Sequence, residues 1–94
     1  MSSTRSLIWD SWNKEHIKKH KVSVAEVEDV YKSTTVSKKS YQNRTLLIGR
    51  TNKGRLLTVI LSREKQTNPY VVSSRDASSK ERRYYEKTNT DKTI

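Results

Sequence analysis

Residues 44–63, RTLLIGRTNKGRLLTVILSR, contain two apolar segments separated by a short polar link. Residues 44–50 and 55–63 are rich in Leu, Ile, Val and Thr, the composition typical of strands. Between them, residues 51–54 (Thr-Asn-Lys-Gly) offer Asn and Gly for the positive φ angles of a hairpin loop. The stretch therefore predicts an antiparallel hairpin.

Two helical patterns precede the hairpin. Asp10 can cap a first helix that runs to about His20. The residues at helical spacing in it are Trp12, Asn13, His16, Ile17 and His20. Ser23 and Glu26 form an S-x-x-E capping box, which opens a second helix that ends near residue 32. The two helices are expected to join near residue 21.

Further strands lie on both sides of the hairpin. Residues 34–38 are β-branched and predict a short edge strand, and residues 70–75 predict another strand after the Asn68-Pro69 turn signal. A second S-x-x-E box at residues 78–81 opens a C-terminal helix of two to three turns. Its inward-facing candidates are Tyr84 and Tyr85.

The element order predicts an α+β fold: a small antiparallel sheet of three or four strands, two N-terminal helices and one C-terminal helix. We expect the helices to cover one face of the sheet and to leave the other free for a ligand. Residues 1–94 then form a single domain with an ordered core at about residues 7–87. The polar ends, residues 1–6 and 86–94, are expected to fray.

Charge and composition limit the function. Twenty Lys and Arg against ten Asp and Glu give a net charge of +10, which favours an anionic partner such as nucleic acid. The absence of cysteine excludes disulfides, zinc–thiolate sites and cysteine nucleophiles. No apolar run approaches the length of a membrane helix or of a secretion signal, so we expect a cytoplasmic protein.

Arginines stand near the ends of the predicted strands. Arg50, Arg55 and Arg75 could converge on a phosphodiester, because guanidinium groups match phosphate oxygens and stay charged. They could equally be solvated strand ends or protect a sheet edge. Arg63 lies two residues after Leu61, so it falls on the same face of the second hairpin strand as Arg55, Leu57, Val59 and Leu61.

His16 and His20 are spaced four residues apart on one helix face. They could contact a ligand or stabilise the helix end, or transfer protons. A metal site is the weakest alternative, because HIKKH lacks the Glu of H-E-x-x-H and no third ligand is evident.

Trp9 and Trp12 could stack on bases, but we expect both to anchor the core. The basic clusters are Lys14, Lys18, Lys19 and Lys21 on the first helix and Lys80, Arg82 and Arg83 on the last.

Three segments together resemble a known family, the BrnT-type toxins. Residues 8–22 (IWDSWNKEHIKKHKV) are similar to the opening motif of that family. Residues 47–59 (LIGRTNKGRLLTV) resemble its central strands, and residues 71–85 (VVSSRDASSKERRYY) resemble its C-terminal part. The resemblance covers about residues 7–87.

The resemblance implies a RelE-like fold and the toxin half of a type II toxin–antitoxin pair. Such a toxin is a metal-independent endoribonuclease without a cofactor that inhibits translation and growth. The implied partner is a BrnA-like antitoxin that binds DNA, in a complex that is often a heterotetramer and that represses its own operon.

The family pattern also implies site residues. The catalytic candidates are Arg50, Arg75, His16, His20 and Lys19. The RNA-binding candidates are Arg55, which the resemblance also implies, and four residues that we add from the sequence itself: Arg63, Lys18, Arg82 and Tyr85. Arg50 and Arg75 would stabilise charge in the transition state, whereas the general base stays open among His16, His20, Lys19 and Tyr85. The alternatives to a nuclease are a non-catalytic basic module that binds nucleic acid and a subunit of an autoregulatory repressor.

The chain departs from the family pattern at two positions. Lys21 replaces a Gly at a helix end, where we expect it to adopt the left-handed conformation at a cost of roughly 1 kcal/mol. Asp76 replaces the commoner Pro after Arg75 and adds negative charge near a helix N-terminus.

Overall fold

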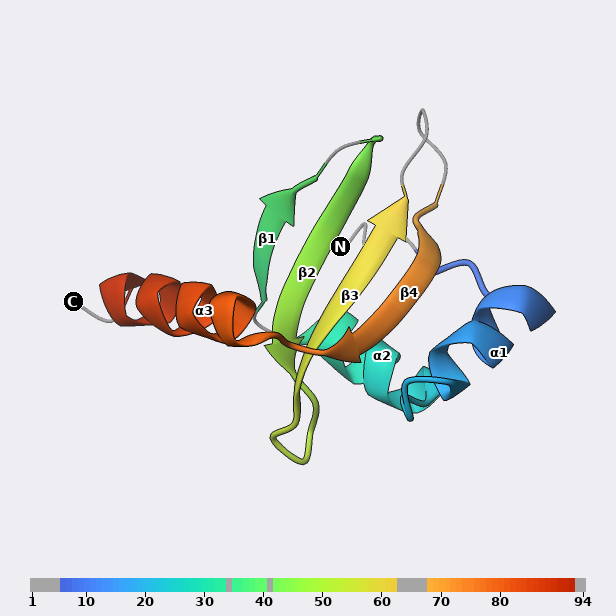
Figure 1. Cartoon of the computed structure of the whole chain (residues 1–94), viewed down its shortest axis with the longest axis horizontal. Helices are drawn as coiled ribbons and strands as arrows, with labels where there is room; N and C mark the ends of the chain where they lie inside the picture. Colours follow the sequence, from blue (N-terminus) through green and yellow to red (C-terminus); the bar gives the residue numbers. More distant parts are fainter. Residues whose placement is uncertain (1–5, 34, 41, 63–67, 93–94) are drawn as a thin grey trace.

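The computed structural model describes residues 6–33, 35–40, 42–62 and 68–92, and it contains one antiparallel sheet with three helices (Figure 1). The strands are ordered β1-β2-β3-β4 across the sheet. The elements in chain order are α1 (Ser11–Lys18), α2 (Val24–Lys32), β1 (Val36–Lys39), β2 (Arg44–Arg50), β3 (Leu56–Ser62), β4 (Tyr70–Asp76) and α3 (Ser79–Lys92). The predicted α+β class, the element order and the edge position of the first strand are confirmed.

Both N-terminal helices begin with the predicted caps. The side chain of Asp10 accepts a hydrogen bond from the backbone N–H of Asn13, whose own side chain accepts one from Asp10. Ser23 and Glu26 form the reciprocal capping box. Lys21, between the helices, has φ 60°, so it does adopt the left-handed conformation.

The central hairpin pairs β2 with β3, from Arg44 opposite Ser62 to Arg50 opposite Leu56. In the loop, Gly54 has a positive φ of 91°, but Asn52 does not, which corrects the prediction for that residue. The hydroxyl of Thr51 closes the loop by accepting a hydrogen bond from the backbone of Arg55.

The main core lies between one face of the sheet and helices α1 and α2. Side chains of β3 alternate, so that Leu57, Val59 and Leu61 face this side. They pack against buried residues of the helices, among them Ile17 and Val27. These apolar residues provide most of the driving force for folding.

A second, smaller core lies on the opposite face of the sheet. Tyr85 of α3 packs there against Val36, Ile48 and Leu56. The prediction that all helices share one face is therefore wrong. Hydrophobic period identifies the buried side of a helix but not the face of the sheet that it covers. The helix is also longer than predicted, since its backbone stays helical to Lys92.

On α1, the residues that the sequence places at helical spacing form two neighbouring rows, one buried and one exposed. Asn13 and Ile17 are fully buried, whereas the side chain of Trp12 is 57% exposed. Trp12 is therefore not a core anchor. Trp9 is half-buried against the main core and donates its indole N–H to Glu28.

None of the described helices is both long and apolar enough to cross a bilayer.

Asn13 connects α1 to the sheet edge. Its amide nitrogen donates hydrogen bonds to the backbone oxygens of Ile8 and Val71, each at 3.0 Å. Asn13→Ala would leave both of these backbone oxygens without their hydrogen-bond donor inside the protein. We therefore expect this substitution to lower the free energy of unfolding by about 2–4 kcal/mol. Urea denaturation measures this loss. Lys14→Ala, on the exposed side of the same helix, is the control, and equal stability of the two variants would contradict this role.

Candidate functional site

A guanidinium–carboxylate pair connects the end of β4 to the start of α3. Arg75 donates from Nη1 to Oε1 of Glu81 at 2.7 Å and from Nη2 to Oε2 at 2.9 Å. This two-point contact fixes the plane of the guanidinium. The Arg75 side chain is 37% exposed and that of Glu81 only 15%, so the arginine lies on the solvent side of the pair.

Glu81 has further donors around the same carboxylate. Its Oε1 also accepts from the Thr58 hydroxyl at 2.8 Å and from the Ser78 backbone N–H at 2.9 Å. The hydrogen bonds from Arg75 contribute most to lowering the pKa of Glu81, to about 2. Arg75 in turn has its pKa raised by Glu81. Glu81 therefore remains ionised and acts as a fixed partner for the arginine.

Arg50 lies on the same face of the sheet. The register pairs Thr58 with both Ile48 and Arg75, and pairs Arg50 with Leu56, so these side chains share one face. The exposed Arg50 guanidinium lies over the ring of Tyr85, 5.6 Å from the centroid, and donates to the backbone oxygen of Gly54. Within the described residues it has no carboxylate partner.

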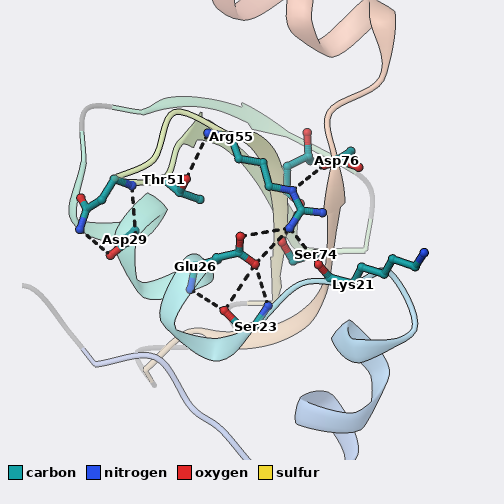
Figure 2. A network of polar contacts seen from close by, with 10 residues as sticks. Lys21, Ser23, Glu26, Asp29, Thr51, Arg55, Ser74 and Asp76 are labelled. Atoms are coloured by element: carbon teal, nitrogen blue, oxygen red, sulfur yellow. Dashed lines mark hydrogen bonds and ion pairs between the residues drawn. The ribbon is translucent and has the colours of Figure 1, made fainter.

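Arg55 belongs to a different polar network on the opposite face (Figure 2). Its guanidinium donates to Asp76 at 2.8 Å, to both carboxylate oxygens of Glu26 and to the backbone oxygen of Lys21. The pKa of Arg55 is raised, with the hydrogen bond to Asp76 as the largest cause. The pKa of Glu26 is lowered, chiefly by the Ser23 backbone N–H. Arg55 thus ties α2 to the sheet.

Both departures from the family pattern meet in this network. Lys21 contributes its backbone oxygen and Asp76 its carboxylate, and both accept from Arg55. Asp76 therefore binds an arginine side chain in addition to adding charge before α3. Together these contacts link the α1–α2 connection, the hairpin loop and the end of β4.

The other predicted residues lie on α1 or just after it, and this helix packs on the sheet face opposite Arg50 and Arg75. His16 is half-buried on α1, which ends at Lys18, two residues before the predicted end at His20, and which lies at the opposite end of the molecule from α3 (Figure 1). Lys19 and His20 are exposed in the turn that follows this helix. Lys18 pairs with Glu15 at 3.5 Å on the same helix. No group of three potential metal ligands occurs within the described part of the chain.

Of the remaining candidates, two belong to α3. Tyr85 is buried beside Arg50, and Arg82 is exposed on α3. Arg63 lies outside the described residues. The structure thus brings together Arg50, Arg75 and Tyr85 at one end of one sheet face, but not Arg55 or the residues of α1.

Sequence reasoning missed the roles of Glu81 and Thr58. Glu81 was recognised only as part of a capping box, although the box also places its carboxylate on the first turn after the strand that carries Arg75. An arginine at a strand end, followed six residues later by the Glu of such a box, is the signal that could have indicated the pair. Thr58 carries no comparable signal, because only the strand register brings it to Glu81.

Comparison with known proteins identifies the family. The model of a family described as "Ribonuclease toxin, BrnT, of type II toxin-antitoxin system" matches residues 9–81. The chain belongs to the BrnT family of ribonuclease toxins. The matched segment includes Arg50, Arg75 and Glu81, whereas Tyr85 lies beyond it.

The crystal structure of the Brucella abortus ribonuclease toxin BrnT has a similar fold. It matches with a TM-score of 0.62 and 25% sequence identity, over 78% of this chain and 96% of that one. A search of curated proteins finds no match. The resemblance to BrnT-type toxins is therefore confirmed, and membership of a type II family implies a protein antitoxin as partner.

The lowered pKa of Glu81 makes its contribution to stability depend on pH. A carboxyl with a pKa of about 2 when folded and 4.5 when unfolded stabilises the fold fully above pH 4.5, and this stabilisation is lost as the pH falls toward 2. We expect Glu81→Gln to cost about 1–3 kcal/mol at pH 7, and the difference from the parent chain to shrink below pH 4.5.

Urea denaturation at a series of pH values measures this dependence. Glu15→Gln is the matched control, because Glu15 is 70% exposed in its pair with Lys18 and should change stability little at any pH. A constant difference between Glu81→Gln and the parent chain across this range would contradict the assigned role of the pair.

Proposed function

We propose that this BrnT-family toxin is a metal-independent endoribonuclease that cleaves RNA at the sheet face carrying Arg50, Arg75 and Tyr85. The supporting observation is the arrangement of Arg50 and Arg75 on one face and at one end of the sheet. Arg50 has no carboxylate partner in the described chain, and Arg75 is held in a fixed orientation by Glu81. Two such guanidinium groups suit a phosphodiester.

The proposed reaction is an in-line displacement at phosphorus. The 2′-hydroxyl of a ribose loses its proton and attacks the adjacent phosphate, and the 5′ oxygen leaves with a proton. Arg50 and Arg75 stabilise the negative charge that develops on the phosphate oxygens. Arg75 uses three of its five N–H donors on Glu81 and Asp76, which leaves two for a phosphate.

Tyr85 is the acid–base candidate nearest to these arginines. Its ring lies against the Arg50 guanidinium, so a phosphate bound by Arg50 would approach the same end of α3. The other candidates, His16, Lys19 and His20, lie on α1 or in the turn after it, on the opposite face of the sheet, and we assign them to binding of the RNA strand. Arg82, exposed on α3, extends the basic surface beside the arginine site.

The net charge of +10 favours two kinds of binding partner, RNA and an acidic protein. We propose that a BrnA-like antitoxin with a DNA-binding domain neutralises the toxin in a heterotetramer. Operator DNA is then bound through the antitoxin. Without the antitoxin, cleavage of cytoplasmic RNA would inhibit translation and growth.

Cleavage of a long RNA by the purified, antitoxin-free chain in EDTA tests the proposal. We expect fragments that end in 2′,3′-cyclic phosphate. Arg50→Ala and Arg75→Ala should each lower the cleavage rate by about 10²–10³-fold, because each removes one donor of charge stabilisation. Arg44→Ala is the matched control: Arg44 lies on the same strand and face as Arg50 but at the opposite end of β2.

Thermal unfolding followed by circular dichroism separates loss of activity from loss of fold, which matters most for Arg75 because of its pair with Glu81. Wild-type cleavage by Arg50→Ala would overturn the assigned site. RNA that is bound but recovered intact would instead support the non-catalytic binding module.

A further inference from the structure

Three aromatic rings form a row on the outward side of α1. Trp12 and His16 lie one turn apart on the same face of α1, and His20 follows in the turn after the helix. The rings of Trp12 and His16 are stacked, with centroids 4.8 Å apart and an interplanar angle of 9°. His16 and His20 meet edge to face at 5.7 Å. We call these three side chains the α1 ring row.

The α1 ring row contributes little to the core. Asn13 and Ile17 make the buried contacts of α1, and Trp9 supplies the indole that packs on the main core. Trp12 is 57% exposed even though His16 covers one side of its ring. The other side of the indole is therefore available to a planar partner.

A shallow hollow lies beside the row. It has a volume of about 300 Å³ and is lined by Ser11, Trp12, Glu15, His16 and Lys19. The hollow thus combines aromatic surface with polar groups that can donate or accept hydrogen bonds. A base that stacks on Trp12 would have its edge near these groups.

The surrounding charge favours a polyanion. Residues 11–21 contain Lys14, Lys18, Lys19 and Lys21 and a single acidic residue, Glu15. The carboxylate of Glu15 is paired with Lys18, so it opposes a phosphate less than a free carboxylate would. Aromatic rings surrounded by lysines are the usual surface for single-stranded nucleic acid, in which rings stack on bases and cations hold phosphates.

We propose that the α1 ring row is a stacking platform for single-stranded RNA, with Trp12 as the residue that receives a base. Lys19, which lines the hollow, and Lys18, which pairs with Glu15 at its edge, hold the phosphates beside it. The platform lies on the side of the sheet that α1 covers, whereas the arginine site lies on the opposite face. A strand that occupies both would be held at two separated points, so the platform acts in RNA binding and not in the chemical step.

Binding of a short 2′-O-methyl RNA strand tests the platform, since this probe lacks the attacking hydroxyl and cannot be cleaved. We expect Trp12→Leu, which keeps an apolar side chain but removes the ring, to weaken binding roughly 5- to 150-fold. Trp12→Phe should retain most of the affinity. An abasic strand of equal length and charge should bind the parent chain and Trp12→Leu equally.

The two indole N–H resonances provide a second measurement. That of Trp12 should shift on addition of the strand, whereas that of Trp9, which is hydrogen-bonded to Glu28, should not. Parent-like binding by Trp12→Leu, or an equal loss for base-bearing and abasic strands, would overturn the proposal. A Trp12 signal that responds to the antitoxin but not to RNA would also overturn it and would assign this face to protein binding. A loss of RNA cleavage alone would leave the platform intact.

Discussion

The carboxylate of Glu81 receives hydrogen bonds from three parts of the chain: Arg75 at the end of β4, Thr58 in β3 and the Ser78 backbone before α3. This contact fixes where the C-terminal helix leaves the sheet, and so it directs Tyr85 onto the face opposite α1 and α2. It also sets the plane of the Arg75 guanidinium. The second core and the arrangement of the arginine site both depend on this one ionised group.

Arg50 and Arg55 differ in how far the fold already engages their guanidinium groups. Arg55 is engaged by Asp76, Glu26 and the Lys21 backbone, so its donors serve the fold (Figure 2). Arg50 contacts only a backbone oxygen and the Tyr85 ring within the described chain. A guanidinium without a carboxylate partner has more to gain from a phosphate, because no existing ion pair has to be given up.

The sequence was sufficient to predict the element order, the capping boxes and the hairpin, since these follow from local pattern. It did not predict the face covered by α3, which depends on the contact of Glu81 with residues distant in the chain. The helical period grouped Trp12 with Ile17, although neighbouring stripes of a helix can face opposite environments. Arg50 and Arg55 were expected to converge. The register instead places Arg50 on the face of Leu56, whereas Arg55 bonds Asp76 on the opposite face, which Leu57 shares.

The most direct test of the arginine site is a titration of the chain with a non-cleavable RNA dinucleotide, followed through the arginine Nε–Hε resonances. The signals of Arg50 and Arg75 should shift together as the dinucleotide binds. Those of Arg55, held in its network, and Arg44, at the other end of β2, should stay unchanged. Shifts of Arg55 equal to those of Arg50, or no shift at Arg50 and Arg75, would contradict the assignment of this sheet face to the RNA phosphate.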